Sequence, residues 1–300
     1  LLGVSKQAYY KKEDHVMEKL AREAFVVEYI KEVRSKDPGI GGEKLWMMYR
    51  KKFGREESVG YNRFYDIIEK YDLKVRKRRR RVRTTDSTHD YPLYANLVNE
   101  IIPERANQIW VSDITYISLS AGPEKVDGGF CYLSLITDIY SKEIIGYSLG
   151  RTLETKYTME ALEMAFKRLQ GDSGKGLIHH SDRGVQYASY AYTDALKEKG
   201  IKISMTESGN PKDNAVAERV NNTIKNELLM GMNFQNMEEV RKALDAAVAF
   251  YNTERPHMSL DGMTPSEASH RTGEIRKEWT SFRENAIRKN RDKGNYLYLQ

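Results

Sequence analysis

Near residue 108 the sequence changes from helix-like and turn-like segments to short runs of β-branched and aromatic residues. Three such runs, at residues 108–118, 130–139 and 142–150, follow one another, and only a short turn separates the last two. Runs of this composition between turn residues are typical of strands, and the short turn predicts a hairpin. We therefore expect three consecutive strands that pair antiparallel.

Amphipathic segments and apolar runs alternate in the rest of the chain. The predicted helices are residues 155–170, 187–200, 215–229 and 236–256, and the predicted strands between them are residues 175–180 and 201–205. Asn236 and Glu239 form a capping-box pattern at the start of the last helix. The order β-β-β-α-β-α-β-α predicts an α/β fold with a mixed sheet, whose later strands are reached by crossovers.

A helical region precedes the predicted sheet. Residues 6–35 have helical spacing, and residues 38–42 contain one proline and three glycines, which end that pattern. Residues 43–53 and 61–73 then predict two short helices around a tight, glycine-containing turn. Helices joined in this way are typical of a helix-turn-helix unit, although any small helical domain contains such pairs.

The stretch LKVRKRRRRVR, residues 73–83, holds eight cations in eleven positions and no acid. It belongs to a chain with a net charge of +6 and a pI of about 9.0. Such a block repels itself until phosphates or counterions neutralise it, so it cannot pack into a core. We expect it to contact nucleic acid, with a solvated linker or a localisation-like tract as the alternative. The predicted contacts are Arg76, Lys77, Arg78, Arg79, Arg80 and Arg81.

The composition argues against several classes of protein. The sequence has no run of 18 apolar residues, so we expect no membrane span. A single cysteine, Cys131, excludes an internal disulfide and a cysteine-built zinc site, and its apolar neighbours predict a core position. A reducing cytoplasm fits this composition. The chain begins with Leu1 rather than Met, which is typical of a fragment or of the downstream part of a longer product.

Three acids occupy informative positions. Asp113 lies within WVSDITYI, and a charge on a central strand needs a partner or an ion. Asp182 follows the apolar run LIHH, and strand ends are where α/β sheets build their sites. Glu218 lies early in a predicted helix. Each has a simpler interpretation: a core salt bridge for Asp113, a turn or helix cap for Asp182, and a solvated helix face for Glu218.

Together the three acids suggest a metal site. If the strands are arranged as expected, the acids come from a central strand, the end of a neighbouring strand and the start of a helix. Converging carboxylates raise one another's pKa unless a cation neutralises them. Mg²⁺ prefers oxygen ligands, and two such ions about 3.5–4 Å apart can clamp the attacking and leaving oxygens of a phosphoryl displacement.

Four segments carry a resemblance to a known family: WVSDITYI, HHSDRGVQYAS, ESGNPKDNAVAERVNNTIKNE and YNTERPHMSLDGMTPSEA. They occur in order over residues 109–268, more than half of the chain. In them the chain resembles the retroviral-integrase-like DDE transposases of bacterial insertion sequences, specifically insertion-sequence family three. The 35 residues between Asp182 and Glu218 match that group's interval, and Lys225 matches its trailing basic residue. Residues 41–76 also resemble the family's helix-turn-helix segment.

The resemblance implies an RNase H-like fold with a mixed five-stranded sheet flanked by helices. It implies that Asp113, Asp182 and Glu218 hold two Mg²⁺ ions, for which Mn²⁺ can substitute. The implied activity is strand cleavage at the terminal inverted repeats of an element, followed by attack of the freed 3′-OH on target DNA. The implied setting is a homo-oligomer on DNA, at least a dimer, in the bacterial cytoplasm with the nucleoid. A partner segment from an upstream reading frame is also implied, joined by frameshift fusion.

The resemblance further implies DNA contacts around the acids. The candidates are Arg183, Asn210, Lys212, Asn214, Arg219 and Lys225. Lys212 departs from the family, in which an aromatic residue is common at this position. His180 either orients Asp182 or lies near the scissile phosphate, and a buried hydrogen-bonded histidine is the alternative. We expect the late segment YNTERPH to pack a helix and a turn against the core.

These patterns predict four regions. They are a helical DNA-binding region at residues 1–84, a linker at 85–105, a catalytic core at 106–270 and a basic tail at 271–300. Two other functions remain open on the same residues. An RNase H-like nuclease without strand transfer would use the same acids, but it would not need the basic run. A DNA-binding regulator without activity would not need the intact set of acids.

Overall fold

A computed structural model of the protein describes residues 6–75, 89–120, 129–169, 174–207, 214–277, 281 and 284–289. The chain divides into two compact units, Leu1–Arg78 and Arg79–Gln300, and each is described by itself. Within the described ranges, no helix combines the length and the apolar character needed to cross a bilayer. The predicted division into four regions stays a prediction.

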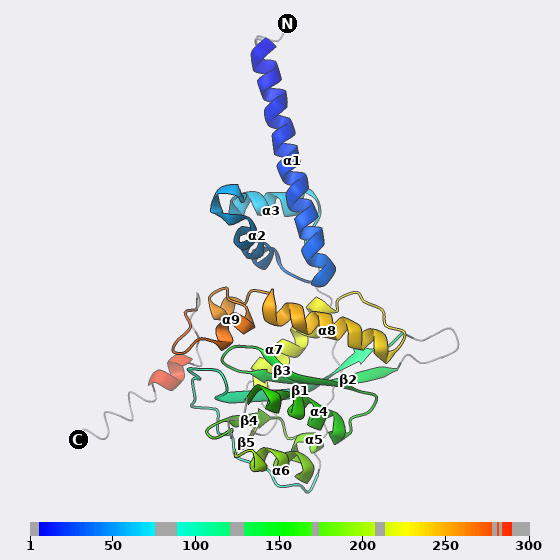
Figure 1. Ribbon diagram of the computed structural model, residues 1–300, viewed down its shortest axis with the longest axis vertical. Coiled ribbons are helices and arrows are strands. Elements are labelled where there is room, and N and C mark those ends of the chain that lie inside the picture. Colours follow the sequence, from blue (N-terminus) through cyan, green and yellow to red (C-terminus); the bar gives the residue numbers. More distant parts are fainter. Residues whose placement is uncertain are drawn as a thin grey trace, which may run out of the picture. The chain divides into compact units, whose positions relative to one another are not determined.

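The N-terminal unit consists of α1 (Lys6–Lys36), α2 (Gly42–Glu57) and α3 (Tyr61–Lys70) (Figure 1). The predicted turn between α2 and α3 begins later than expected, because α2 continues past Gly54. Gly54 has φ +75° and kinks this helix, a conformation that glycine adopts without steric cost. Aromatic rings pack the three helices together. They are Phe25, Tyr29, Tyr49, Phe53 and Phe64.

The second unit is built on one mixed five-stranded sheet. Its strands are β1 (Ile109–Ser118), β2 (Phe130–Asp138), β3 (Ile144–Gly150), β4 (Ile178–Ser181) and β5 (Lys202–Met205). The strand order is β3-β2-β1-β4-β5. β1, β2 and β3 pair antiparallel, whereas β4 pairs parallel with both β1 and β5. The predicted α/β fold with three antiparallel strands first and crossovers afterwards is confirmed.

Helices cover both faces of this sheet (Figure 1). One face carries α4 (Thr155–Phe166) with the 3₁₀ turn η1 (Lys167–Leu169), α5 (Val185–Ala188) and α6 (Tyr190–Glu198). The other carries α7 (Ala215–Thr223) with the π-helical segment η3 (Ile224–Leu228), α8 (Met237–Thr253), η4 (Met258–Leu260) and α9 (Pro265–Ser269). The helix predicted at residues 187–200 is two helices, which meet at Ser189.

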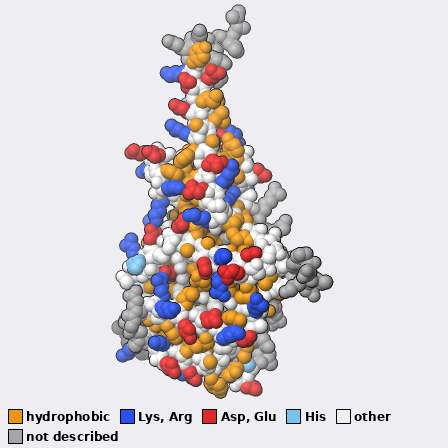
Figure 2. Space-filling view, turned by 45° about the vertical axis from the view of Figure 1, so that its right-hand side comes forward, with side chains coloured by type: hydrophobic (Ala, Val, Ile, Leu, Met, Phe, Trp, Pro, Cys, Tyr) orange, Lys and Arg blue, Asp and Glu red, His pale blue; other side chains and the backbone are white. Residues whose placement is uncertain are grey.

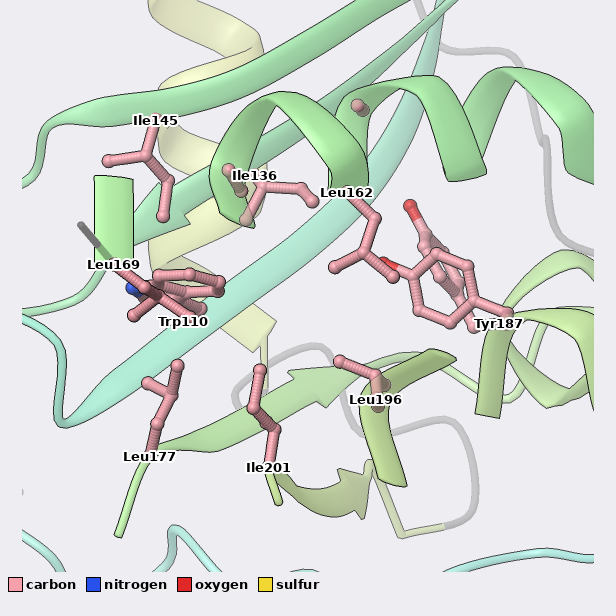
Figure 3. Close-up of a cluster of buried hydrophobic side chains, with 12 residues drawn as sticks. Trp110, Ile136, Ile145, Leu162, Leu169, Leu177, Tyr187, Leu196 and Ile201 are labelled. Atoms are coloured by element: carbon pink, nitrogen blue, oxygen red, sulfur yellow. The ribbon is translucent and has the colours of Figure 1, made fainter. Parts of the chain in front are cut away.

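The main apolar core fills the space between the sheet and α4 to α6 (Figure 3). Trp110, Ile136 and Ile145 contribute from three adjacent strands, and Leu162 and Leu196 contribute from the helices. Burying an aliphatic side chain of this size stabilises the fold by roughly 1.5–3 kcal/mol relative to leaving it exposed. The predicted core position of the cysteine is confirmed as well, since it is fully buried.

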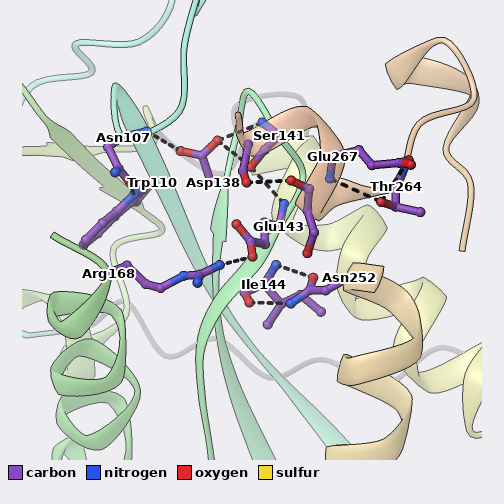
Figure 4. Close-up of polar contacts among 12 residues, drawn as sticks. Asn107, Trp110, Asp138, Ser141, Glu143, Ile144, Arg168, Asn252, Thr264 and Glu267 are labelled. Atoms are coloured by element: carbon purple, nitrogen blue, oxygen red, sulfur yellow. Dashed lines mark hydrogen bonds and ion pairs between the residues drawn. The ribbon is translucent and has the colours of Figure 1, made fainter. Parts of the chain in front are cut away.

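Polar contacts hold the sheet where β1 begins (Figure 4). Asp138 accepts hydrogen bonds from the Ser141 amide at 2.8 Å and from the Asn107 amide at 2.8 Å. Asn252, on α8, accepts from the Ile144 amide at 3.0 Å and donates to the Ile144 carbonyl at 2.9 Å. These bonds tie β1, β2, β3 and α8 together, so they fix the strand that carries Asp113.

Helix α8 is anchored at both ends. Asn236 caps it by accepting from the Glu239 amide at 3.0 Å, as predicted. The Glu239 carboxylate accepts from the Gln235 amide at 2.8 Å, one residue before the partner that a regular capping box uses. Beyond the C-terminal end, the buried Arg255 donates through Nε to Glu227 at 3.1 Å. The late segment YNTERPH therefore packs against η3 through this ion pair, in keeping with the packing role expected for it.

The described part of the predicted linker lies on the second unit. The Leu97 amide donates to Ser204 Oγ at 2.9 Å, and His89 Nε2 lies 2.8 Å from the Arg183 carbonyl. Near its end, the Glu104 carbonyl accepts from the Gly273 amide at 2.7 Å. Residues from the predicted linker and the predicted tail therefore pair with each other and with the core.

Charge is mixed on one face of the molecule. On the face drawn in Figure 2, the side chains of Lys and Arg are interspersed with those of Asp and Glu over the described residues. On that face, charges mixed in this way create no large field of one sign. The concentrated positive charge of the sequence is in residues 76–83, which lie outside the described residues.

Candidate active site

Asp113 and Asp182 come from neighbouring parallel strands. β1 and β4 pair with Val111 opposite His180. Each acid lies two residues beyond that pair, so the same register brings them to adjacent positions where β4 ends. Parallel neighbours are about 4.8 Å apart, and equal offsets place side chains on the same face of a sheet. The predicted juxtaposition of a central strand with the end of its neighbour is present.

Asp113 is held by two hydrogen bonds. Its Oδ1 accepts from the Ile114 amide at 2.9 Å, and its Oδ2 accepts from Asn221 Nδ2 at 2.8 Å. Burial raises the pKa of Asp113 to about 7, and the negative charges of Asp182 and Glu218 add to that rise. The charges of the other two predicted acids therefore both reach Asp113. The alternative, a core salt bridge, is not what the described contacts of Asp113 show.

Asp182 begins a tight turn. Its Oδ1 accepts from the Gly184 amide at 3.0 Å, and Gly184 precedes the first residue of α5. A short polar side chain that accepts from the amide two residues later is an Asx turn. The turn predicted as the simpler role of Asp182 is thus present, and it also orients the carboxylate beside β1.

Glu218 lies in the first turn of α7, which packs against β1 and β2. The Glu218 side chain as a whole is exposed. Its carboxylate is nevertheless partly shielded from water by the protein, and this desolvation raises the pKa of Glu218. Asn221, the partner of Asp113, lies three residues later in the same helix. Residues three apart lie on the same helix face, so Glu218 is directed to the side of α7 that meets Asp113.

The three described cations predicted to contact DNA have different surroundings. Arg219 is exposed. Arg183 is half-buried and donates through Nε to the Thr206 carbonyl at 2.7 Å. Lys225 lies in η3 with its Nζ 3.2 Å from the centre of the Tyr116 ring, and burial lowers its pKa. Their contact with DNA stays a prediction.

Two other predicted site residues are buried. Asn214 donates through Nδ2 to the Ser112 carbonyl at 2.9 Å, so its amide fixes the start of α7 against β1. This burial favours a positioning role over the predicted DNA contact. His180 is fully buried, and its Nδ1 lies 2.8 Å from Ser204 Oγ. That is the arrangement of the alternative interpretation, a buried hydrogen-bonded histidine.

The remaining predicted contacts lie outside the described residues. They are Asn210 and Lys212 in the loop before α7, and Arg76, Lys77, Arg78, Arg79, Arg80 and Arg81 in the basic run.

Comparison with known proteins gives concordant matches. Two families, each described as an integrase core domain, match residues 103–211 and 199–265. An uncharacterized 31 kDa protein of insertion element IS600 from Shigella sonnei is 35% identical over 210 residues, which are 69% of this chain and 74% of the relative. The chain belongs to the insertion-sequence transposases with an integrase core domain. The predicted family, DDE transposases of insertion sequences, is confirmed, and with it a DNA transposase as the function.

Another relative matches a larger part of the chain. A putative transposase for insertion sequence element IS986/IS6110 of Mycobacterium tuberculosis is 29% identical over 276 residues, which are 89% of this chain and 95% of the relative. Among solved structures, one match is the HTLV-2 integrase catalytic core domain in complex with magnesium. The match covers 56% of this chain and 100% of the integrase chain. That pair has 21% sequence identity and a TM-score of 0.42.

The donor atoms around Asp113 fit a divalent cation. Within the described ranges, no three acidic, histidine or cysteine side chains form a ready-made metal site. However, the side-chain oxygens of Asn214 and Asn221 are buried there without a hydrogen-bond partner. A hydrated cation would supply positive charge to the acids and water as a donor to such oxygens. The residues of the transposase that could hold it are Asp113, Asp182 and Glu218.

Sequence reasoning missed the partner of Asp113 and a separate set of buried neutral groups. Asn221 was visible as an amide three residues after Glu218, but nothing in the sequence showed that it bonds Asp113. A buried network beside β1 was also missed. Ser112 Oγ lies 2.7 Å from His179 Nε2, and the Tyr192 hydroxyl lies 3.0 Å from the same nitrogen. Burial lowers the pKa of His179 to about 3, so its ring is neutral.

Proposed function

We propose that the transposase uses Asp113, Asp182 and Glu218 to cleave a DNA strand at the ends of its element. The freed 3′-OH is then joined to target DNA. The observation that carries this proposal is the parallel register of β1 and β4, which brings Asp113 and Asp182 to adjacent positions. The charge of Glu218, which also reaches Asp113, supports the third assignment.

We propose Mg²⁺ as the cofactor, with Mn²⁺ as a substitute and two ions for each active site. When bound, such ions neutralise the acids, activate water and stabilise the leaving 3′-oxygen. The protein prepares the ligands. Because the Ile114 amide and Asn221 each hold one oxygen of Asp113, its carboxylate is fixed in orientation before any ion arrives.

The cations around the acids position the DNA. Arg183 follows Asp182, Arg219 follows Glu218, and Lys225 comes two helical turns after Glu218. Contacts from such groups to phosphates fix the register of a protein on DNA without reading its sequence. The loop residues Asn210 and Lys212, and the basic run Arg76, Lys77, Arg78, Arg79, Arg80 and Arg81, would add contacts of the same kind.

The reaction also requires partners. We propose that the transposase acts as a homo-oligomer, at least a dimer, because both terminal inverted repeats of an element must be held together for transfer. A segment encoded by an upstream reading frame would be a further partner. The proposed setting is the bacterial cytoplasm, with the DNA of the nucleoid as substrate and target.

A strand-cleavage and joining assay tests the proposed function. Labelled oligonucleotides with the ends of the element are incubated with Mg²⁺ or Mn²⁺ and with the wild type or Glu218→Gln. The wild type should give joined product, and Glu218→Gln should lower its yield at least about 100-fold, as should EDTA. Glu238→Gln is the matched control, since Glu238 is also in the first turn of a helix.

Each outcome of the assay has a separate meaning. Cleavage without joining would support the nuclease function instead. Tight DNA binding without cleavage by the wild type would support a regulator. Equal loss of product in Glu218→Gln and Glu238→Gln would show that the assay does not report on the three acids.

A further inference from the structure

The Tyr187 hydroxyl is a buried polar group that makes no hydrogen bond within the described residues. Tyr187 lies on α5 and is 3% exposed. Its ring packs against the rings of His179 and Tyr192, with centroid distances of 6.4 Å and 5.3 Å. Figure 3 shows it beside Leu162 at one end of the apolar cluster, away from Leu169 and Leu177.

Packing explains the ring of Tyr187 but not its oxygen. The neighbouring Tyr192 is also fully buried, and its hydroxyl has a partner in His179 Nε2 at 3.0 Å. A buried hydroxyl without a partner lowers stability, whereas phenylalanine would fill the same space without that cost. A tyrosine at position 187 is therefore unfavourable for the fold taken alone, which points to a role in the site.

The surroundings of Tyr187 connect it to two of the acids. The Tyr187 amide donates to the Gly184 carbonyl at 3.0 Å, and the Gly184 amide is the group that holds Asp182. On its other side, His179 bonds Ser112, the residue before Asp113. Burial raises the pKa of Tyr187 most strongly, and the charges of Tyr192, Asp113 and Asp182 raise it further. The hydroxyl is thus protonated, a donor, and within the field of both acids.

We propose that Tyr187 is a positioning residue of the acidic site. Its hydroxyl donates a hydrogen bond to the oxygens that surround a divalent cation held by Asp113 and Asp182. This inference rests on the proposed function, because it requires that these acids bind such an ion. Donors behind the ligands of a metal fix their orientation and strengthen binding, and their loss typically weakens metal affinity by about 10–100-fold.

The test compares Tyr187→Phe with Tyr192→Phe in the full chain. Both changes remove one hydroxyl from a buried ring, and among the residues that the structure describes only the second hydroxyl has a partner. Mn²⁺ binding is followed by the electron paramagnetic resonance signal of the free ion, and the melting temperature is measured in EDTA. Asp113→Asn serves as the reference for binding that does not involve the acids.

The two variants should affect different properties: Tyr187→Phe should weaken Mn²⁺ binding, and Tyr192→Phe should lower the Tm. Tyr187→Phe should bind Mn²⁺ about tenfold more weakly than the wild type, with an unchanged or higher Tm in EDTA. Tyr192→Phe should lower the Tm by about 2–4 °C, because it removes a buried hydrogen bond, and keep Mn²⁺ binding within about twofold.

Two results would overturn the inference, and they can be told apart. If Tyr187→Phe binds Mn²⁺ like the wild type while Asp113→Asn does not bind it, Tyr187 has no positioning role and the proposed metal site stands. If the wild type and Asp113→Asn bind Mn²⁺ equally, the acids do not hold the ion, and the proposed cofactor site fails together with the role of Tyr187.

Discussion

The carboxylate of Asp113 has one hydrogen bond from the main chain and one from the Asn221 side chain. We predict that Asn221→Leu, a change of similar volume, lowers the rate of DNA joining about 10–100-fold, because Asp113 then loses one of the two bonds that orient it. The rate of joined-product formation measures this effect. Asn222→Leu is the matched control, since Asn222 is the next residue and is exposed. Equal rates in the two variants would contradict the positioning of Asp113 by Asn221.

Glu23 is a buried acid of the N-terminal unit. It accepts from Lys70 Nζ at 2.6 Å and from the Tyr71 hydroxyl at 3.1 Å, and it pairs with Arg63. The hydrogen bond from Lys70 lowers its pKa below the ordinary value of 4.5, although burial opposes this. A lowered pKa in the folded state stabilises the fold above the unfolded pKa, and this stability is lost as the pH falls through the folded pKa.

We therefore predict that Glu23→Gln lowers the free energy of unfolding at pH 7 by about 1.5–3 kcal/mol, the usual worth of hydrogen bonds to a charged group. The difference from the wild type should shrink as the pH falls below 4.5. Urea unfolding at several pH values measures both effects. Glu28→Gln is the control, because the pair of Glu28 with Lys31 is exposed and should contribute less than about 1 kcal/mol.

At the scale of elements, α4 lies unusually close to β3. A Cβ built on Gly146 would lie 2.1 Å from the Ala161 carbonyl oxygen, which belongs to the helix backbone. We predict that Gly146→Ala destabilises the fold by about 1–3 kcal/mol, because α4 must move away from the sheet. Thermal unfolding measures the loss. In the control Gly129→Ala, the new Cβ meets nothing within 4 Å. A Tm as high as that of the control would show that α4 shifts without cost.

Helix α7 and the segment η3 after it illustrate how far element prediction reaches. The apolar spacing after residue 214 predicted one helix, and its start was placed correctly because the onset of helical spacing is a local signal. The same spacing could not show that residues Ile224–Leu228 adopt π-helical bonding. That change coincides with the buried pair of Glu227 with Arg255, a residue 28 positions away in sequence. Local periodicity contains no information on such a partner.

At the scale of the whole molecule, the basic run should govern the salt dependence of DNA binding. We predict that replacing Arg76, Lys77, Arg78, Arg79, Arg80 and Arg81 by glutamine lowers the slope of log K against log salt by up to about 5, since each phosphate contact contributes about 0.9. Fluorescence anisotropy at several salt concentrations measures the slope. The decrease should be the same for DNA with and without element ends, because phosphate contacts are not sequence-specific. An unchanged slope would make the run a solvated linker.

The sequence alone determined the order of strands and helices and the capped start of α8, and it singled out the three acids as candidates for the site. These properties are local: they depend on periodicity, on residue type and on motif segments that can be read along the chain. The resemblance of those segments to insertion-sequence transposases was sufficient for the family. None of this required knowledge of which distant residues touch.

Only the tertiary structure decided how the acids are supported. The register of β1 against β4 brings Asp113 and Asp182 to adjacent positions, and the packing of α7 on β1 gives Asp113 its bond to Asn221. The tertiary packing also buries His180 and leaves the Tyr187 hydroxyl without a partner among the described residues. Burial and hydrogen bonding of this kind depend on contacts between residues far apart in sequence, and those contacts exist only once the chain has folded.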